Sequence, residues 1–335
     1  METRFRDLAD LARLPWFKVV DGRLVMHDRS VGPIIDMHTH LALAYVRPLQ
    51  LDLRKPTPWT EHYLPACCAV DLDVYVNRNF TVARLKQMKR DLTLGSLTAG
   101  GLRATHTLPN LLREMGEMGI ARSVLLPIDF PFLSRNSENA LEVTRGVEGI
   151  VCFGSIHPYD VDMEHHLDDL VARGARGVKM HPAVQSVRPD NERAIKLYRA
   201  CGARGLPVLW HCGPVGIEPR LGRHLSQVRF YERPLRECPE TTFVLGHAGA
   251  LQVEEATALL NRYPNAWMEI SSQGLPALRR LLEQGDTRRI MYGTDWPFYH
   301  QAIALAKVLM ATEGNAALRH GVLYGNAARL LRLPS

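Results

Sequence analysis

Short apolar, β-branched runs recur along the chain from residue 34 onward, each followed by a polar or Gly/Pro break and then a helical stretch. Continuous apolar runs of this kind are typical of buried parallel strands. The pattern therefore predicts eight strands, at residues 34–40, 123–129, 150–157, 177–182, 207–212, 242–247, 266–271 and 289–295.

The stretches between these strands predict helices at 79–94, 107–119, 160–173 and 190–204. Residues 107–119, for example, place leucines and methionines on one face and end at Gly119. From the second strand onward the strands recur every 23 to 34 residues, which is the period of a βα unit. Eight such units predict an α/β fold, a (β/α)₈ TIM barrel. The competing doubly wound sheet often carries GxGxxG after its first strand, and that motif is missing there.

The interval between the first and second strands is much longer than this spacing, since 86 residues separate positions 38 and 124. We expect residues 41–106 to be a long insertion after strand 1, within one barrel domain that spans residues 1–335. An insertion at this point lies on the C-terminal face of a barrel, so it would form a lid or substrate wall. The alternative is that this insertion is a surface segment without a functional role. Residues 17–26 alternate around Asp21-Gly22, which predicts a short β-ribbon in an N-terminal extension, 1–33.

Composition and charge exclude several classes of function for this chain. The chain is 46% hydrophobic and 23% charged, and no apolar run approaches the roughly 20 residues of a membrane span. Its net charge is +6, but the 34 Arg and 7 Lys are scattered and form no block of five. We therefore expect neither nucleic acid nor membrane as a partner, but a small anionic molecule. We also expect a homo-oligomer, a dimer.

The six cysteines form no CxxC pair, which disfavours a cysteine-based zinc site. The first residues, METRFRD, lack the apolar core of a signal peptide. Reduced thiols and a cytoplasmic location are the expectation.

The polar residues at the carboxyl ends of five predicted strands are the candidates for metal binding and catalysis. They are His38 and His40, Lys179 with His181, His211, His247, and Asp295. Strand alternation puts His38 and His40 on one face about 7 Å apart, with Asp36 one step below, so both imidazoles can reach one metal. Each motif alone is weak, but the carboxyl ends of all barrel strands meet at one rim.

These motifs make the chain similar to the amidohydrolase superfamily, and more narrowly to the branch that holds aminocarboxymuconate-semialdehyde decarboxylase, resorcylate decarboxylases and several lactone or carboxylate hydrolases. The resemblance covers roughly residues 34–332 and rests on DMHTH, GVKMHP, VLWHCG, VLGHAG, YGTDWP and GNAARLL. It implies that His38, His40 and His211 are metal ligands, and that Asp295 both contacts the metal and handles the proton of its water. His247 would hold a second metal ion or act on the substrate.

The ligand types suit a divalent metal, Zn²⁺ first, as one or two ions, and they are also compatible with Mn²⁺ and Fe²⁺. Three interpretations of Lys179 stay open: a carboxylated metal ligand, a free cation that binds a substrate carboxylate, or a structural ion pair. His181 lies inward on the same strand and is a further candidate to bind the substrate. Arg220 and Arg223 are candidates to clamp an acidic substrate. Glu269 is expected to be a buried carboxylate behind the ligands, and Trp296, Tyr299 and His300 to shape the pocket.

The resulting hypothesis is a metal-dependent hydrolase of a small carboxylate-bearing ester, lactone or amide, with Asp295 and His247 as catalytic residues. A non-hydrolytic lyase, either a decarboxylase or a hydratase, would use the same ligands. The third hypothesis is a barrel that has lost catalytic activity and serves as a binding scaffold. The full set of strand-end residues argues against it.

Overall fold

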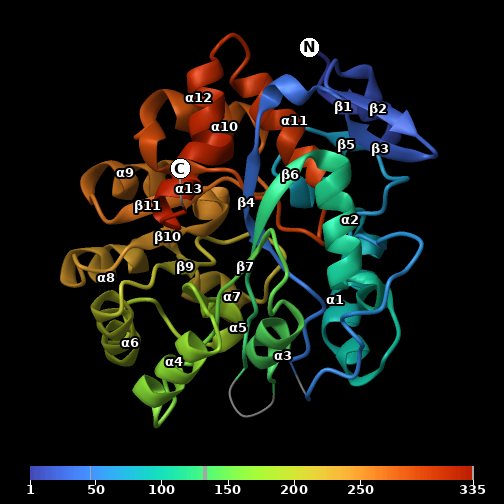
Figure 1. Ribbon diagram of the computed structural model, residues 1–335. Coiled ribbons are helices and arrows are strands. Elements are labelled where there is room, and N and C mark those ends of the chain that lie inside the picture. The colour runs from blue at the N-terminus through green and yellow to red at the C-terminus, as the bar shows by residue number, and fades with distance from the viewer. Residues whose placement is uncertain (46, 131–133, 334–335) are drawn as a thin grey trace.

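The computed structural model describes residues 1–45, 47–130 and 134–333. Eight parallel strands surround its centre (Figure 1). They are β4 (Ile34–Thr39), β6 (Ile120–Leu125), β7 (Ile150–Cys152), β8 (Val178–Met180), β9 (Val208–Trp210), β10 (Phe243–Leu245), β11 (Ala266–Glu269) and β12 (Ile290–Met291).

Two sheets, β4-β6-β7 and β8-β9-β10-β11-β12, close into a barrel through two parallel bridges. Gly154, just after β7, pairs with Val178 of β8, and Thr39 of β4 pairs with Trp296 beyond β12. Backbone hydrogen bonds from Met37 N to Tyr292 O (3.0 Å) and from Asp295 N to His38 O (2.8 Å) continue the second seam. The predicted (β/α)₈ TIM barrel is confirmed.

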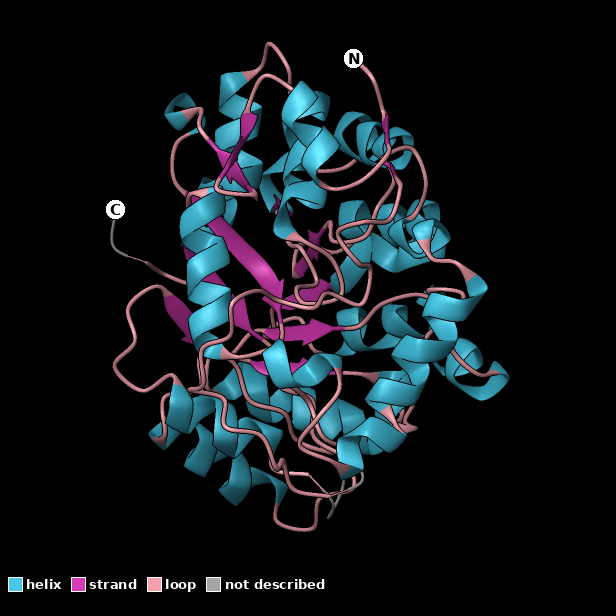
Figure 2. Ribbon diagram, turned by 90° about the vertical axis from the view of Figure 1, so that its right-hand side faces the viewer, coloured by secondary structure: helices cyan, strands magenta, loops and turns pink. Residues whose placement is uncertain are grey.

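Helices surround the strands, as Figure 2 shows. The longer ones are α2 (Leu108–Met118), α3 (Asn136–Val143), α4 (Met163–Ala172), α6 (Glu192–Ala203), α9 (Val253–Arg262), α10 (Leu275–Gln284) and α11 (Gln301–Ala311). Shorter ones are α5 (Pro182–Gln185), α7 (Arg220–Leu225), α8 (Glu232–Glu237), α12 (Ala316–His320) and α13 (Asn326–Leu330). The predicted helices at 107–119, 160–173 and 190–204 correspond to α2, α4 and α6.

The predicted N-terminal ribbon is the antiparallel pair β2 (Phe17–Val20) and β3 (Arg23–Met26). A second small antiparallel pair joins β1 (Arg4–Phe5) to β5 (Val70–Asp71), so the N-terminal extension pairs with the segment inserted after β4. Both pairs lie together at the upper right of Figure 1. The same insertion contains α1 (Val82–Leu92), where a helix was predicted over 79–94.

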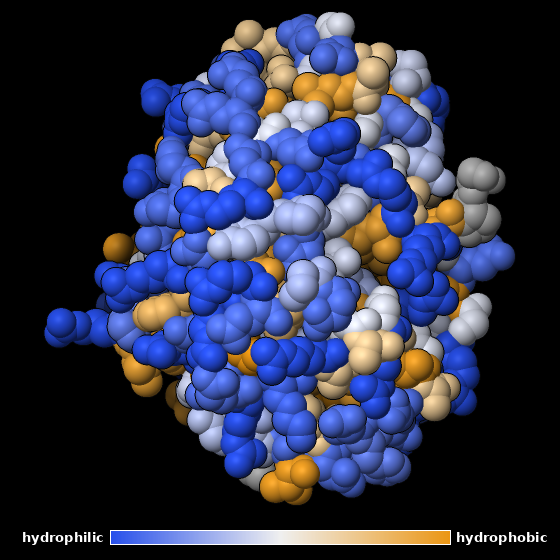
Figure 3. Space-filling view, turned by 90° about the vertical axis from the view of Figure 1, so that its left-hand side faces the viewer, coloured by the Kyte–Doolittle hydropathy of each residue, from blue (hydrophilic) through white to orange (hydrophobic). Residues whose placement is uncertain are grey.

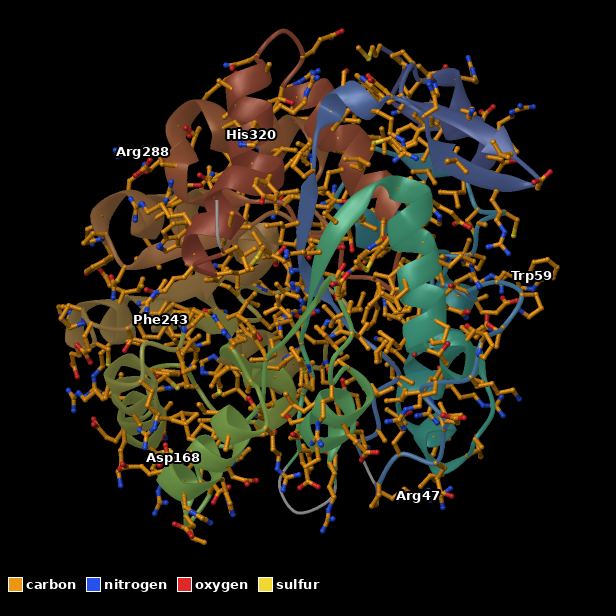
Figure 4. All side chains as sticks on the ribbon, viewed as in Figure 1. Arg47, Trp59, Asp168, Phe243, Arg288 and His320 are labelled. Atoms are coloured by element: carbon orange, nitrogen blue, oxygen red, sulfur yellow. The ribbon has the colours of Figure 1, made fainter. Side chains whose placement is uncertain are left out.

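The core has two layers, because alternate strand residues face opposite sides of the barrel wall. Side chains such as Val124, Leu209 and Val244 fill the interior, while neighbours such as Val208 and Leu245 pack outward against the helices. Phe243, labelled in Figure 4, is one of the fully buried outward residues. The outer face shown in Figure 3 is mostly hydrophilic. No helix within the described residues is long and apolar enough to cross a bilayer.

All eight strands are shorter than predicted, and most of the difference lies at their carboxyl ends. β10 ends at Leu245 rather than 247, and β12 at Met291 rather than 295. The residues that follow leave the extended conformation: His247 and Asp295 have φ of 52° and 62°. Apolar alternation cannot show this turn, because polar strand-end residues look alike whether or not they pair in a sheet.

Candidate active site

His38, His40 and Asp295 form a compact buried group at the carboxyl ends of β4 and β12. The two histidine Nε2 atoms are 3.2 Å apart. The Asp295 Oδ1 atom lies 3.3 Å from His40 Nε2 and 3.7 Å from His38 Nε2. Three potential metal-ligand atoms thus face one point, from elements that are more than 250 residues apart in sequence.

The hydrogen bonds of the two imidazoles fix where their lone pairs point. His38 Nδ1 is 2.7 Å from Glu269 Oε1, and His40 Nδ1 is 2.6 Å from the Leu126 carbonyl oxygen. Both partners only accept, so each Nδ1 carries the proton and each Nε2 presents a lone pair. Two lone pairs at 3.2 Å repel unless a cation lies beside them.

This donor set fits a metal ion. Bonds of about 2.0–2.1 Å in a tetrahedral zinc site place neighbouring ligand atoms about 3.3 Å apart. The His38–His40 and His40–Asp295 separations of 3.2 and 3.3 Å match that spacing. Burial holds the pKa of His38 well below its usual value, and the charges of Lys179 and His40 act in the same direction. The ring is therefore neutral, as a metal ligand must be.

An irregularity in β4 turns His38 toward the site. Ile35 and Met37 pack in the barrel interior, so strict alternation would turn His38 away from it. The register of β4 against β6 shifts between Asp36 and Thr39, and an irregularity of this kind can re-aim a side chain.

Asp36 therefore does not lie below the histidine pair, contrary to the expectation from alternation. Its carboxylate accepts hydrogen bonds from Thr294 Oγ1 (2.6 Å) and Gln301 Nε2 (3.0 Å) instead. Because it also accepts from the His38 and Thr294 backbone N–H groups, it joins β4 to the turn that carries Asp295.

Asp295 is almost buried and combines two uncommon features. Its backbone is left-handed, with φ of 62°, a conformation that Asp tolerates better than most residues. Burial raises the pKa of its carboxyl group, although the neighbouring His40 and the charge of Lys179 oppose that shift. A carboxylate with a raised pKa is a better proton acceptor near neutral pH than an exposed one.

His211 and His247 lie beside this group and pair with one another, His247 Nε2 to His211 Nδ1, at 3.0 Å. The Ser271 hydroxyl is 2.8 Å from His247 Nδ1. His247 also forms a second compact group with His38 and Glu269. Burial lowers the pKa of His211 to about 3 and that of His247 well below its usual value. Both rings are therefore neutral potential ligands.

Lys179 is fully buried, and its Nζ lies 3.2 Å from His38 Nε2. Burial lowers its pKa to about 8, while the charges of Glu269 and Asp295 oppose the shift. His181, two residues on, stacks on the His211 ring with centroids 4.0 Å apart. The strand places both side chains against the predicted ligands.

Glu269 of β11 organises the ligands from behind. Its Oε1 atom accepts from His38 Nδ1 (2.7 Å) and from the His247 backbone N–H (2.5 Å), and its Oε2 atom from the Ser271 N–H (2.8 Å). Gly293 gives this carboxylate room, since a Cβ there would lie 2.3 Å from Oε2. The buried carboxylate expected at Glu269 is present.

The candidate ligands and Lys179 line one cavity of about 400 Å³. Its lining includes His38, His40, Lys179, His181, His211, His247 and Asp295. The insertion forms part of the wall, through Tyr45 and Tyr75 and through Met88, Lys89 and Leu92 of α1. Phe298 and Tyr299, from the segment after Asp295, also line it. Trp296 and His300, expected to shape the pocket, do not line it directly.

Arg220 and Arg223 are not brought into this lining. Both lie on α7 and are exposed, and the cavity wall ends at the preceding residues Glu218 and Pro219. The insertion residues in the wall, Tyr45 and Tyr75 among them, were not identified from sequence. Only their position in an insertion on the catalytic face could have indicated them. Trp59 of the same insertion projects outward, 66% exposed (Figure 4).

The architecture is similar to several solved structures. An uncharacterized TIM-barrel protein from Bordetella bronchiseptica shares 18% identity at a TM-score of 0.63, over 90% of this chain and 99% of that one. A probable 2-pyrone-4,6-dicarboxylic acid hydrolase from Acinetobacter baumannii shares 13% at 0.57, over 89% and 99%. A 2,6-dihydroxybenzoate decarboxylase from Rhizobium shares 14% at 0.56, over 89% and 99%. At these identities the likeness shows the fold.

No curated protein sequence matches the chain significantly. The sequence model of the amidohydrolase family matches residues 135–333, more than half of the 335 residues. The matched region contains Lys179, His211, His247 and Asp295, and the structure brings the His38–His40 pair to them. The chain belongs to the amidohydrolase family.

Proposed function

We propose that this protein is a metal-dependent hydrolase of a small carboxylate-bearing ester, lactone or amide. One observation carries the proposal: the lone pairs of His38 and His40 and the carboxylate of Asp295 meet within 3.7 Å at the wall of a cavity. Two neutral imidazoles and one carboxylate form a ligand set that suits Zn²⁺.

The ligands we propose are His38, His40, His211 and Asp295, with His247 and Lys179 available to a second ion. A bound divalent metal would supply a Lewis acid and would make a water molecule acidic enough to react near neutral pH. The proton transfers would be carried out by a side chain of the protein. Asp295 accepts the proton of the attacking water and returns it to the leaving group, which its raised pKa favours.

Lys179 gives the site its proposed preference for anions. The side chain is fully buried, its Nζ contacts His38, and both residues line the cavity. An ammonium group in this position is costly unless an anion joins it, and a substrate carboxylate would supply that charge. With Arg220 and Arg223 outside the wall, Lys179 and the more exposed Lys89 are the cations that line this cavity among the described residues.

A non-hydrolytic lyase with the same ligands is the second candidate. The likeness to a decarboxylase structure favours it, although at 14% identity that likeness concerns the fold. Both reactions need the carboxylate-binding cation and the polarising metal, and they differ in the bond that breaks.

The test measures two products from one reaction. Zinc-loaded protein is incubated with a panel of lactone and aromatic carboxylates, and acid release is followed by titration and carbon dioxide by trapping. We expect acid release without carbon dioxide, and loss of at least about 100-fold in kcat for Asp295→Asn. Carbon dioxide release would favour the lyase. Full activity after complete metal removal would refute both candidates.

A further inference from the structure

Glu114 is a buried carboxylate outside the cavity that gathers three side chains. It lies on α2 and is 3% exposed. Its Oε2 atom accepts hydrogen bonds from Trp296 Nε1 and from His62 Nε2, both at 3.0 Å. His300 Nε2 lies 3.8 Å from the same oxygen. The cavity lining includes none of these four residues.

These side chains come from segments that both border the active site. His62 belongs to the insertion, while Trp296 and His300 belong to the segment that follows Asp295. The backbones of the two segments are also paired. Tyr63 N donates to Pro297 O at 3.3 Å, and Leu64 N donates to Phe298 O at 2.9 Å. Glu114 therefore lies where a barrel helix, the insertion and the Asp295 segment meet.

Trp296 connects this junction to the proposed ligands. Its carbonyl oxygen accepts from His40 N at 2.7 Å, and its own N–H donates to Thr294 Oγ1 at 3.2 Å. The preceding residue, Asp295, holds a left-handed backbone that its surroundings must maintain. The indole is fully buried, so the hydrogen bond to Glu114 fixes its orientation.

The charge of Glu114 indicates more than simple packing. Burial alone disfavours a carboxylate, but the charge and hydrogen bond of His62 and the charge of His300 outweigh it and lower the pKa to about 2. Hydrogen bonds to an ionised acceptor are stronger than neutral ones, so the carboxylate holds the indole more firmly than an amide would.

We propose that Glu114 is a positioning residue that holds Asp295 in place through the Trp296 indole and couples the insertion to that segment through His62. This inference rests on the proposed function, because it assigns Glu114 a role toward a proposed metal ligand. A purely structural ion pair between α2 and the insertion is the alternative, and it would not act on Asp295.

The test uses Glu114→Gln, which keeps the shape and removes the charge. The matched control is Glu117→Gln, one helical turn along α2, where the carboxylate pairs with Arg23 at 2.9 Å. ¹⁵N-labelled tryptophan gives one indole signal for each of the five tryptophans, and Trp296→Phe assigns the one from Trp296. Zinc affinity is measured by competition with a chromophoric chelator, and melting temperature is recorded for each variant.

For Glu114→Gln we expect the Trp296 indole N–H to move upfield and exchange faster, and the zinc affinity to fall about 10-fold, the lower end of the usual effect of outer-shell changes. Glu117→Gln should change neither. An unchanged indole signal, or an unchanged zinc affinity together with a lowered melting temperature, would overturn the proposal in favour of the structural ion pair.

Trp296→Phe keeps the test decisive if Glu114→Gln does not fold. It removes the donor while preserving an aromatic ring, and it should lower zinc affinity to a similar degree; unchanged affinity would refute the proposal. If the unmodified protein binds no zinc, the proposed function fails. The indole signal then still decides whether Glu114 orients Trp296, and an unchanged signal would overturn that step separately.

Discussion

His38 Nδ1 and Glu269 Oε1 are 2.7 Å apart, and this contact determines which nitrogen of His38 faces the site. The carboxylate holds the proton on Nδ1 and leaves the Nε2 lone pair directed at His40 and Asp295. A carboxylate behind a ligating histidine both orients the ring and makes it more basic. Glu269 also accepts from the backbone of His247, so one buried side chain orders two of the proposed ligands.

Replacing Glu269 by Gln should therefore weaken metal binding without removing a proposed ligand. The amide oxygen can still accept from His38 and from the His247 backbone but carries no charge, and the NH₂ group would then face the backbone donor of Ser271. We expect zinc affinity to fall about 10- to 100-fold, by chelator competition. Glu283→Gln, on the exposed side of α10, is the control and should change nothing. Equal affinities for both variants would contradict the role given to Glu269.

Lys179→Met tests whether the buried ammonium binds a substrate carboxylate. A lost charge-assisted hydrogen bond of about 1.5–3 kcal/mol corresponds to a rise in KM of about 10- to 100-fold for anionic substrates. Neutral esters should be affected far less, because they have no carboxylate to lose. Steady-state kinetics on matched acid and ester substrates measure the difference. Equal losses on both, together with loss of a second metal ion, would instead indicate a carboxylated Lys179.

The double variant Arg220→Gln, Arg223→Gln should leave substrate binding nearly unchanged. Both side chains are exposed on α7, outside the cavity wall, so solvent screens their charges. We expect KM for anionic substrates to change less than about twofold, against the larger change for Lys179→Met. A tenfold rise in KM would mean that α7 moves over the cavity when substrate binds.

The barrel itself was predictable from sequence because buried parallel strands leave a strong signal. Apolar runs at the βα spacing identified all eight strands, and the polar residues after them include His38, His40 and Asp295, which the structure brings into one compact group. Strand alternation correctly predicts that Lys179, His211 and Glu269 point inward. His211 and Glu269, for example, lie two positions after the interior residues Leu209 and Trp267. Where the backbone is regular, sequence position translates directly into direction.

Irregular backbone and long-range packing explain what could not be predicted. The register shift in β4 separates Asp36 from the His38 side, although their spacing suggests one face. Glu114 was not identified, because a glutamate on an amphipathic helix normally faces solvent. Its partners His62 and Trp296 are 52 and 182 residues away in sequence. No local pattern brings such residues together.

The buried side chain of Lys307, outside the active-site cavity, predicts a pH dependence of stability. It lies on α11, 2% exposed, with its Nζ donating to Gln273 O at 2.5 Å. Burial lowers its pKa to about 7, and the charge of Asp71 only partly opposes this. An unfolded lysine has a pKa of about 10.4. Between these values the unfolded chain binds more protons than the folded one, so this residue makes stability increase as pH rises from about 7 to about 10.

Lys307→Met should remove that contribution. In denaturant titrations between pH 7.5 and 9.5, the free energy of unfolding of the unmodified protein should rise more steeply than that of the variant, by about 1 kcal/mol per pH unit. The comparison uses metal-free protein, so that Lys179 titrates alike in both. Lys86→Met, at an exposed position of α1, is the control and should keep the slope of the unmodified protein. Identical slopes for all three proteins would show that Lys307 stays protonated when buried, and that its pKa is not lowered into this range.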